Sequence, residues 1–239
     1  MTNLKVLDLS GIDLKYNVSL PMKLKSLHHL EDLSLKIHSS DPASAESHLQ
    51  GFCDILGENL PSNIKRLTLV GKFKFIDATK LFSHLTSLAH LESFAFKVGT
   101  EKIIRTCFQE SGSYYWKSLK SLDLGDRYER DNMDYSSCFS VLAYLNAAII
   151  EEIKVCGVKL NQVLEFEALF DILLNFTRLK TVEIEFIVQQ KIELAQDQVR
   201  AALKESKLFK KEDLELNLGI KVGPRLFLSY NSQYDRKRF

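Results

Sequence analysis

A hydrophobic signature, leucine-x-x-leucine-x-leucine with some isoleucine, valine or phenylalanine, occurs seven times and constrains the fold more than any other feature. Successive copies begin 26 to 34 residues apart. A repeat of this length indicates stacked supersecondary units, each of which buries its apolar face only against its neighbours. The seven copies are Leu4/Leu7/Leu9, Leu30/Leu33/Leu35, Ile64/Leu67/Leu69, Leu91/Phe94/Phe96, Leu119/Leu122/Leu124, Ile150/Ile153/Val155 and Leu179/Val182/Ile184.

The spacing inside each copy predicts a short β-strand. Side chains alternate between the two faces of a strand, so Leu33 and Leu35 are expected in the core and Ser34 outside. The stretches between the copies carry apolar residues three and four positions apart, which is typical of helices with one apolar face. We therefore expect parallel strands joined by helices, with helices near residues 43–57, 77–89, 101–110, 136–148, 164–176 and 195–207.

Two copies extend the signature by two more apolar positions, over Leu4 to Leu14 and Ile150 to Leu160. With these residues the chain resembles the leucine-rich-repeat family, of the long ribonuclease-inhibitor-like type, over about residues 3 to 220, although Ile12 and Val158 stand where the family has asparagine. The resemblance implies an α/β fold: a curved solenoid or horseshoe with a parallel sheet on the concave face and helices on the convex face. Residues 1–239 would then form a single domain of about seven to eight repeats.

The two ends of the repeat array differ. The first strand starts at Leu4 with no capping element before it, so we expect the chain to be the C-terminal part of a larger protein. At the other end, residues 213–220 and 225–230 alternate in polarity around a turn that contains Gly223 and Pro224. This pattern predicts a closing C-terminal hairpin.

Composition restricts the class of partner. Lysine and arginine total 32 against 31 acidic residues, so no overall field favours nucleic acid. The sequence shows neither a secretory signal nor an apolar run of membrane-spanning length. Four widely spaced cysteines favour free thiols in a reducing, cytoplasmic compartment. The resemblance extends to intracellular leucine-rich-repeat receptors, F-box adaptors and effectors that bacteria secrete into host cells.

Motifs for catalysis are missing from the sequence. Gly71-Lys72 lacks the earlier glycine of a phosphate-binding loop, and Phe73 replaces its serine or threonine. Glu151 and Glu152 are adjacent, so on a strand they point to opposite faces and make a poor acid/base pair. No histidine or cysteine spacing fits a metal site. We therefore expect no enzyme activity, no cofactor and no metal in this segment.

Outward-facing strand residues are the predicted binding site. Five acids against one lysine lie at such positions of the last three strands, which favours a protein partner with a basic segment. The alternative is that these residues only solvate an exposed sheet. A polar loop, residues 125–137, adds residue types that are enriched at interface hot spots. The predicted partner-binding residues are Asp123, Arg127, Tyr128, Arg130, Glu152, Lys154, Glu183 and Glu185.

The leading interpretation is a protein-recognition module that binds through the concave face and its adjacent loops. One alternative is the substrate-reading part of an enzyme such as a ubiquitin ligase, with the catalytic or F-box region upstream. Another is a self-associating scaffold held by the uncovered first repeat at Leu4, Leu7 and Leu14. Trp116, the only tryptophan, is expected to pack in the core.

Overall fold

The computed structural model divides the chain into two compact units, Met1–Leu124 (unit 1) and Gly125–Phe239 (unit 2), and each is treated by itself. Unit 1 contains β1 (Val6–Leu9), α1 (Ser19–Leu24), β2 (Asp32–Ile37), α2 (Ala45–Asn59), β3 (Arg66–Gly71), α3 (Thr79–Ser87), β4 (Ser93–Val98) and β5 (Ser121–Leu124). Unit 2 contains β6 (Met133–Asp134), β7 (Glu152–Leu160), α6 (Leu164–Leu174), β8 (Thr181–Val188), β9 (Glu215–Val222) and β10 (Arg225–Asn231). The structure describes residues 3–10, 19–37, 45–71, 79–98, 116–124, 133–134, 142, 145–160, 164–188, 201, 207, 213–222 and 225–231.

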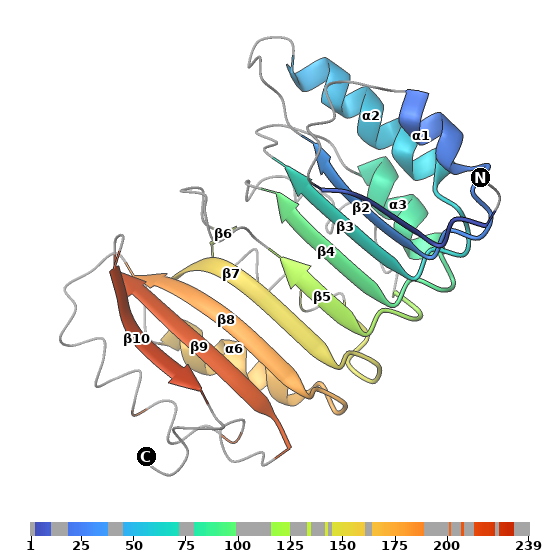
Figure 1. Cartoon of the computed structure of the whole chain (residues 1–239). Coiled ribbons are helices and arrows are strands. Elements are labelled where there is room, and N and C mark those ends of the chain that lie inside the picture. Colours follow the sequence, from blue (N-terminus) through green and yellow to red (C-terminus); the bar gives the residue numbers. More distant parts are fainter. Residues whose placement is uncertain are drawn as a thin grey trace. The chain divides into compact units, whose positions relative to one another are not determined.

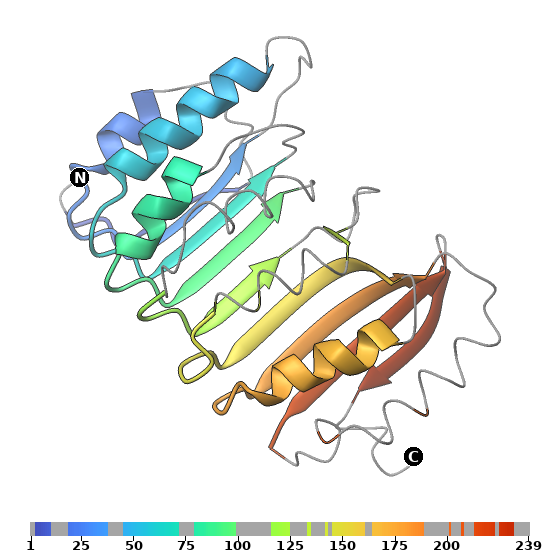
Figure 2. The ribbon, with the colours of Figure 1, turned by 180° about the vertical axis from the view of Figure 1, so that it is seen from behind.

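Unit 1 is an α/β unit with a parallel sheet, as the repeat predicts. Its strands pair side by side in chain order from β1 to β5. Helices α1, α2 and α3 lie on one face of this sheet, and the described residues place no helix on the other (Figures 1 and 2). The register aligns the same position of every copy, so Leu33 lies beside Leu67 and Leu67 beside Phe94.

The aligned apolar positions form the core of unit 1. Leu33 and Leu35 are completely buried, which confirms the predicted alternation in β2. Phe94 is also fully buried, and its ring stacks on Phe96 and on Trp116 with centroid separations of 5.6 and 5.4 Å. Trp116 is only 4% exposed, so its predicted core role is confirmed. Each such ring removes a large apolar area from water and fixes the position of the strand that carries it.

The helices of unit 1 were predictable in part. Helices α2 and α3 match the periodic segments at 43–57 and 77–89, and they pack closely at Gly57. A Cβ atom at Gly57 would lie 3.0 Å from His84 Cδ2 and 3.2 Å from Leu81 Cα. The sequence pattern gave no helix at α1, which has only six residues and includes Pro21. The predicted helix at 101–110 and most of those at 136–148 and 195–207 lie outside the described residues.

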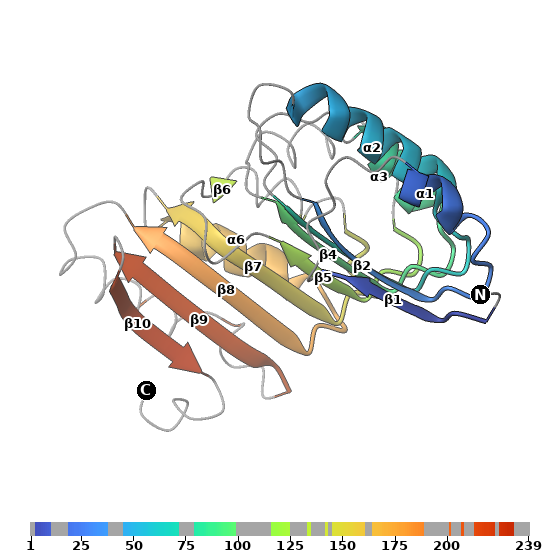
Figure 3. The ribbon, with the colours of Figure 1, turned by 45° about the horizontal axis from the view of Figure 1, so that its top comes forward.

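Unit 2 repeats the parallel arrangement with longer strands. β7, β8 and β9 are parallel neighbours, and β6 pairs with β7. Helix α6 lies against one face of this sheet (Figures 2 and 3) and matches the predicted helix at 164–176. β10 runs antiparallel to β9, so the two strands of the predicted C-terminal hairpin are confirmed.

A bulge in β7 changes one expectation. The pattern groups Cys156 with the outward-facing residues, but its side chain is only 8% exposed. The register steps from Val155 beside Ile184 to Val158 beside Phe186, so two residues of β7 oppose one of β8. Gly157 takes a φ of 81° there, a left-handed conformation that glycine adopts without strain.

Candidate interaction surface

The face of the unit 2 sheet opposite α6 collects the acidic residues that the sequence singles out. Strand register places them in rows that cross β7, β8 and β9 in that order. The first row is Glu152, Thr181 and Glu215, the second is Lys154, Glu183 and Asn217, and in the third Glu185 lies beside Gly219. We call this surface the acidic face and define it by six polar side chains, each of which is half-buried: Glu152, Lys154, Glu183, Glu185, Glu215 and Asn217.

Among the described side chains of the acidic face, carboxylates outnumber cations. Lys154 Nζ lies 3.0 Å from Glu152 Oε1, and Asn217 Nδ2 donates a hydrogen bond to Glu215 Oε1 over 3.2 Å. Lys154 is the one cation among the six described side chains that define this face, against four carboxylates. The neighbouring strands pair through their backbones, which holds these side chains at fixed separations. A rigid acidic surface of this kind favours a partner with positive charge.

Asp213 and Asp123 do not belong to the acidic face. Asp213 is the fifth acid that the alternation places at an outward strand position, but it is exposed and precedes the start of β9. Asp123 lies on β5 in unit 1, where its Oδ2 forms an ion pair with Lys97 Nζ at 2.9 Å. Arg127, Tyr128 and Arg130, the other predicted binding residues, lie outside the described residues.

The corresponding face of unit 1 has balanced charge. Besides the Lys97–Asp123 pair, Arg66 Nη2 lies 2.8 Å from Asp32 Oδ2. Each pair joins strands that are neighbours in the sheet. Because cation and carboxylate occur together, this face offers no excess of either sign at these strands, and unit 2 is the better candidate for electrostatic recognition.

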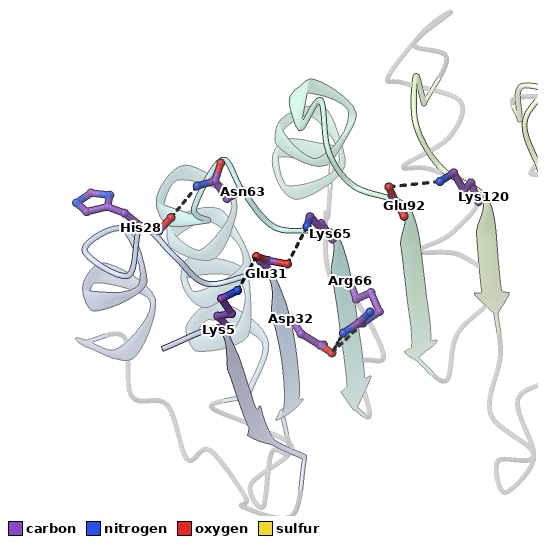
Figure 4. A network of polar contacts seen from close by, with 9 residues as sticks. All are labelled: Lys5, His28, Glu31, Asp32, Asn63, Lys65, Arg66, Glu92 and Lys120. Atoms are coloured by element: carbon purple, nitrogen blue, oxygen red, sulfur yellow. Dashed lines mark hydrogen bonds and ion pairs between the residues drawn. The ribbon is translucent and has the colours of Figure 1, made fainter. Parts of the chain in front are cut away.

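A row of alternating charges at the starts of the strands was missed by the sequence analysis. It consists of the residue that follows the first leucine or isoleucine of each copy, and we call it the entry ladder (Figure 4). In unit 1 the contacts run from Lys5 Nζ to Glu31 Oε1 at 3.9 Å, from Lys65 Nζ to Glu31 Oε2 at 2.8 Å, and from Lys120 Nζ to Glu92 Oε1 at 3.3 Å. The printed sequence contains the signal, because this position alternates as lysine, glutamate, lysine, glutamate and lysine over the first five copies.

Unit 2 uses the same position in the same way. Lys180 Nζ lies 2.6 Å from Glu151 Oε2, and Arg178 Nη2 lies 3.4 Å from Glu151 Oε1. Exposed ion pairs such as these contribute only about 0.2–1 kcal/mol each. The alternation also favours one order of the strands. If one repeat were skipped, like charges would lie beside each other, which is unfavourable.

The described residues contain no group of three or more histidine, cysteine or acidic side chains that could hold a metal ion. Cys53 and Cys156 are free and buried, and burial raises the pKa of the Cys53 thiol to about 12. A thiol with such a pKa stays protonated at neutral pH and is a poor nucleophile.

No protein-family model matches the chain, and no curated protein matches it. The leucine-rich-repeat resemblance therefore stays a prediction that depends on the seven copies of the signature. Within the part of the chain that the structure describes, every helix is too short or too polar to cross a membrane.

Proposed function

We propose that this chain is a leucine-rich-repeat solenoid that binds a partner protein through the helix-free face of its sheet. Two observations support the solenoid. Each described strand from β1 to β5, and β7 and β8, carries one copy of the signature, and within each unit the strands keep the copies in register. The helices among the described residues of each unit lie on one face of its sheet (Figure 2), and the signature's apolar side chains are buried beneath them. This arrangement leaves the other face for recognition.

The acidic face is the single observation that carries the binding proposal. Four carboxylates and one ammonium group lie on three adjacent strands, on a surface held by backbone pairing. Charge complementarity speeds association and selects partners, so the partner that fits best carries a basic segment. Free buried thiols at Cys53 and Cys156 suit a reducing compartment, and we place the protein in the cytoplasm, its own or that of a host cell.

Two matched pairs of charge reversals test this proposal. Glu183→Lys/Glu185→Lys changes the acidic face, whereas Glu58→Lys/Asp171→Lys changes two carboxylates of α2 and α6 by the same total charge. Immobilised wild-type chain and both variants are used to capture proteins from a lysate, and the captured proteins are quantified by mass spectrometry. We expect a partner that the wild type and the helix variant retain and the acidic-face variant loses.

Equal retention by all three chains would reject the acidic face as the recognition surface. Circular dichroism and thermal unfolding serve as the folding control, because Glu183 and Glu185 are half-buried on the sheet surface and their replacement should leave the core intact. A large fall in the midpoint of unfolding would show instead that these two side chains support the fold.

A further inference from the structure

The starts of strands β2 to β5 form a second charged surface, on unit 1. The connections that lead into these strands cover residues 25–31, 60–65, 88–92 and 116–120, and parallel pairing brings them to one edge of the sheet (Figure 4). All four connections lie within the sequence, away from both of its ends. We call this surface the basic rim and define it by its charged and histidine side chains: Lys25, His28, His29, Glu31, Lys65, His90, Glu92, Lys117 and Lys120.

Both carboxylates of the basic rim are already matched by a cation of the entry ladder. Glu31 Oε2 accepts a hydrogen bond from Lys65 Nζ over 2.8 Å. Glu92 Oε1 lies 3.3 Å from Lys120 Nζ. These two pairs therefore neutralise the acidic side chains of the rim.

The other two lysines of the basic rim have no such partner. Lys25 and Lys117 are exposed, and neither forms an ion pair with a described residue. The last turns of α1 and α2 add Lys23 and Glu58, one charge of each sign. Among the described side chains, the rim therefore keeps an excess of positive charge.

Exposed imidazoles add hydrogen-bond donors to the same surface. His28 and His29 precede β2, His90 precedes β4, and all three side chains are exposed. An imidazole carries an N–H donor in its neutral as well as its charged state. The histidines can therefore bond to carboxylates between the two lysines.

Hydrogen bonds between the connections hold the basic rim in place. Asn63 Nδ2 donates to His28 O over 2.7 Å (Figure 4), and Ser118 Oγ donates to Ala89 O over 2.6 Å. Each of these bonds joins the connections of two neighbouring strands. A surface that is fixed in advance loses little conformational entropy when a partner binds.

We propose that the basic rim binds an acidic segment of a partner protein that runs across the starts of β2 to β5. Carboxylates of this segment would pair with Lys25 and Lys117 and accept hydrogen bonds from the histidines between them. Nucleic acid fits less well, because its continuous phosphate backbone would meet Glu31 and Glu92, whereas a peptide can place neutral residues there. This surface differs from the acidic face in both its unit and the sign of its charge.

A fluorescently labelled peptide of alternating glutamate and serine is the probe, and a peptide of alternating glutamine and serine is its uncharged control. Each peptide is titrated with the full chain and followed by fluorescence anisotropy at low and at physiological ionic strength. We expect saturable binding of the glutamate peptide alone, weaker at the higher ionic strength because salt screens exposed charges. Lys25→Glu/Lys117→Glu should lower its affinity about tenfold, since two ion pairs are replaced by two repulsive contacts.

Lys36→Glu/Lys207→Glu is the matched control, because it changes the total charge by the same amount at two positions outside the basic rim. At physiological ionic strength it should bind the glutamate peptide as the wild type does, and circular dichroism verifies that both variants fold. Absence of binding by the wild type, or an equal loss in the two variants, would overturn the proposal.

A single-stranded oligonucleotide of matched length distinguishes the two kinds of polyanion. If it binds more tightly than the glutamate peptide and Lys25→Glu/Lys117→Glu abolishes that binding, the rim belongs to nucleic acid and the proposal is overturned. Oligonucleotide binding weaker than peptide binding supports the acidic segment. All residues of the basic rim lie in unit 1, so the outcome is independent of the acidic face.

Discussion

Lys65 reaches across from the start of β3 to Glu31 at the start of β2, and its ammonium group donates a 2.8 Å hydrogen bond to the carboxylate. The two residues occupy the same place in consecutive copies of the signature. Backbone pairing repeats the relationship, since Lys65 N donates to Glu31 O over 2.8 Å. Side chain and backbone thus specify the same neighbour for each strand, which favours one register of the parallel sheet.

The Glu31 carboxyl group should titrate abnormally. The hydrogen bond and the charge of Lys65 hold the pKa of Glu31 below its ordinary value of 4.5, and Lys5 and Arg66 add smaller effects. A lowered folded-state pKa stabilises the protein above the ordinary pKa, and this contribution is lost as pH falls through the lowered value. NMR titration of the glutamate carboxyl carbons should give a pKa below 4.5 that rises toward 4.5 in Lys65→Met. An unchanged Glu31 pKa in that variant would contradict the contact.

Phe94 should be among the most sensitive core positions. It is fully buried and stacks on both Phe96 and Trp116, so Phe94→Ala leaves a cavity and removes two ring contacts. We expect the free energy of unfolding in urea to fall by about 3–5 kcal/mol. Thr68→Ala, on the helix-free face, is the control and should change it by under about 0.5 kcal/mol. A loss below about 1 kcal/mol for Phe94→Ala would show that the ring is not a core contact.

Gly57→Ala should destabilise the chain although alanine favours helices by about 1 kcal/mol over glycine. The added methyl group would meet His84 Cδ2 at 3.0 Å and Leu81 Cα at 3.2 Å, and the second of these atoms is backbone. In a His84→Ala background the nearest contact disappears, so the loss from Gly57→Ala should be smaller there. Thermal unfolding of the four chains of this double-mutant cycle measures the difference. A stabilised Gly57→Ala would mean that the His84 side chain and the α3 backbone move away from the added methyl group at little cost.

Cys53 should make the chain sensitive to alkali. Its thiol is 4% exposed, and burial raises its pKa from 9.0 to about 12. Above pH 9 the unfolded chain ionises this thiol while the folded chain keeps it protonated, so stability falls as pH rises from 9 toward about 12. Urea unfolding at pH 8 and pH 10 should show a smaller decrease for Cys53→Ala than for the wild type. Equal decreases would contradict the burial of the thiol.

The sequence predicts the strands well because their core positions depend on a local alternation. Leu33, Leu67 and Phe94 are buried as that alternation requires, and the register follows from aligning the copies. Helices α2, α3 and α6 were also predictable, since each is long enough to show an apolar face. The coarse fold, parallel strands with helices on one face of each unit, is thus confirmed.

Other features depend on contacts that no local pattern reveals. Helix α1 is too short for periodicity to detect, and the burial of Cys156 follows from a bulge at Gly157 that alters pairing with β8. The entry ladder is visible in the sequence, but only after the copies are aligned and the residue after each first leucine is compared. The carboxylates of the acidic face were predicted individually, and β8 joins them into one surface by pairing with both β7 and β9.

Site-specific photo-crosslinking tests the recognition surface most directly. A photoreactive amino acid replaces Asn217 on the acidic face or, as the matched control in the same unit, exposed Asp171 on α6. Both chains are irradiated with the partner captured by the wild type, and the covalent products are separated and sequenced. A covalent product from position 217 and none from position 171 is the predicted result. A product from position 171 alone would contradict the account, because it would place the partner on the helical side.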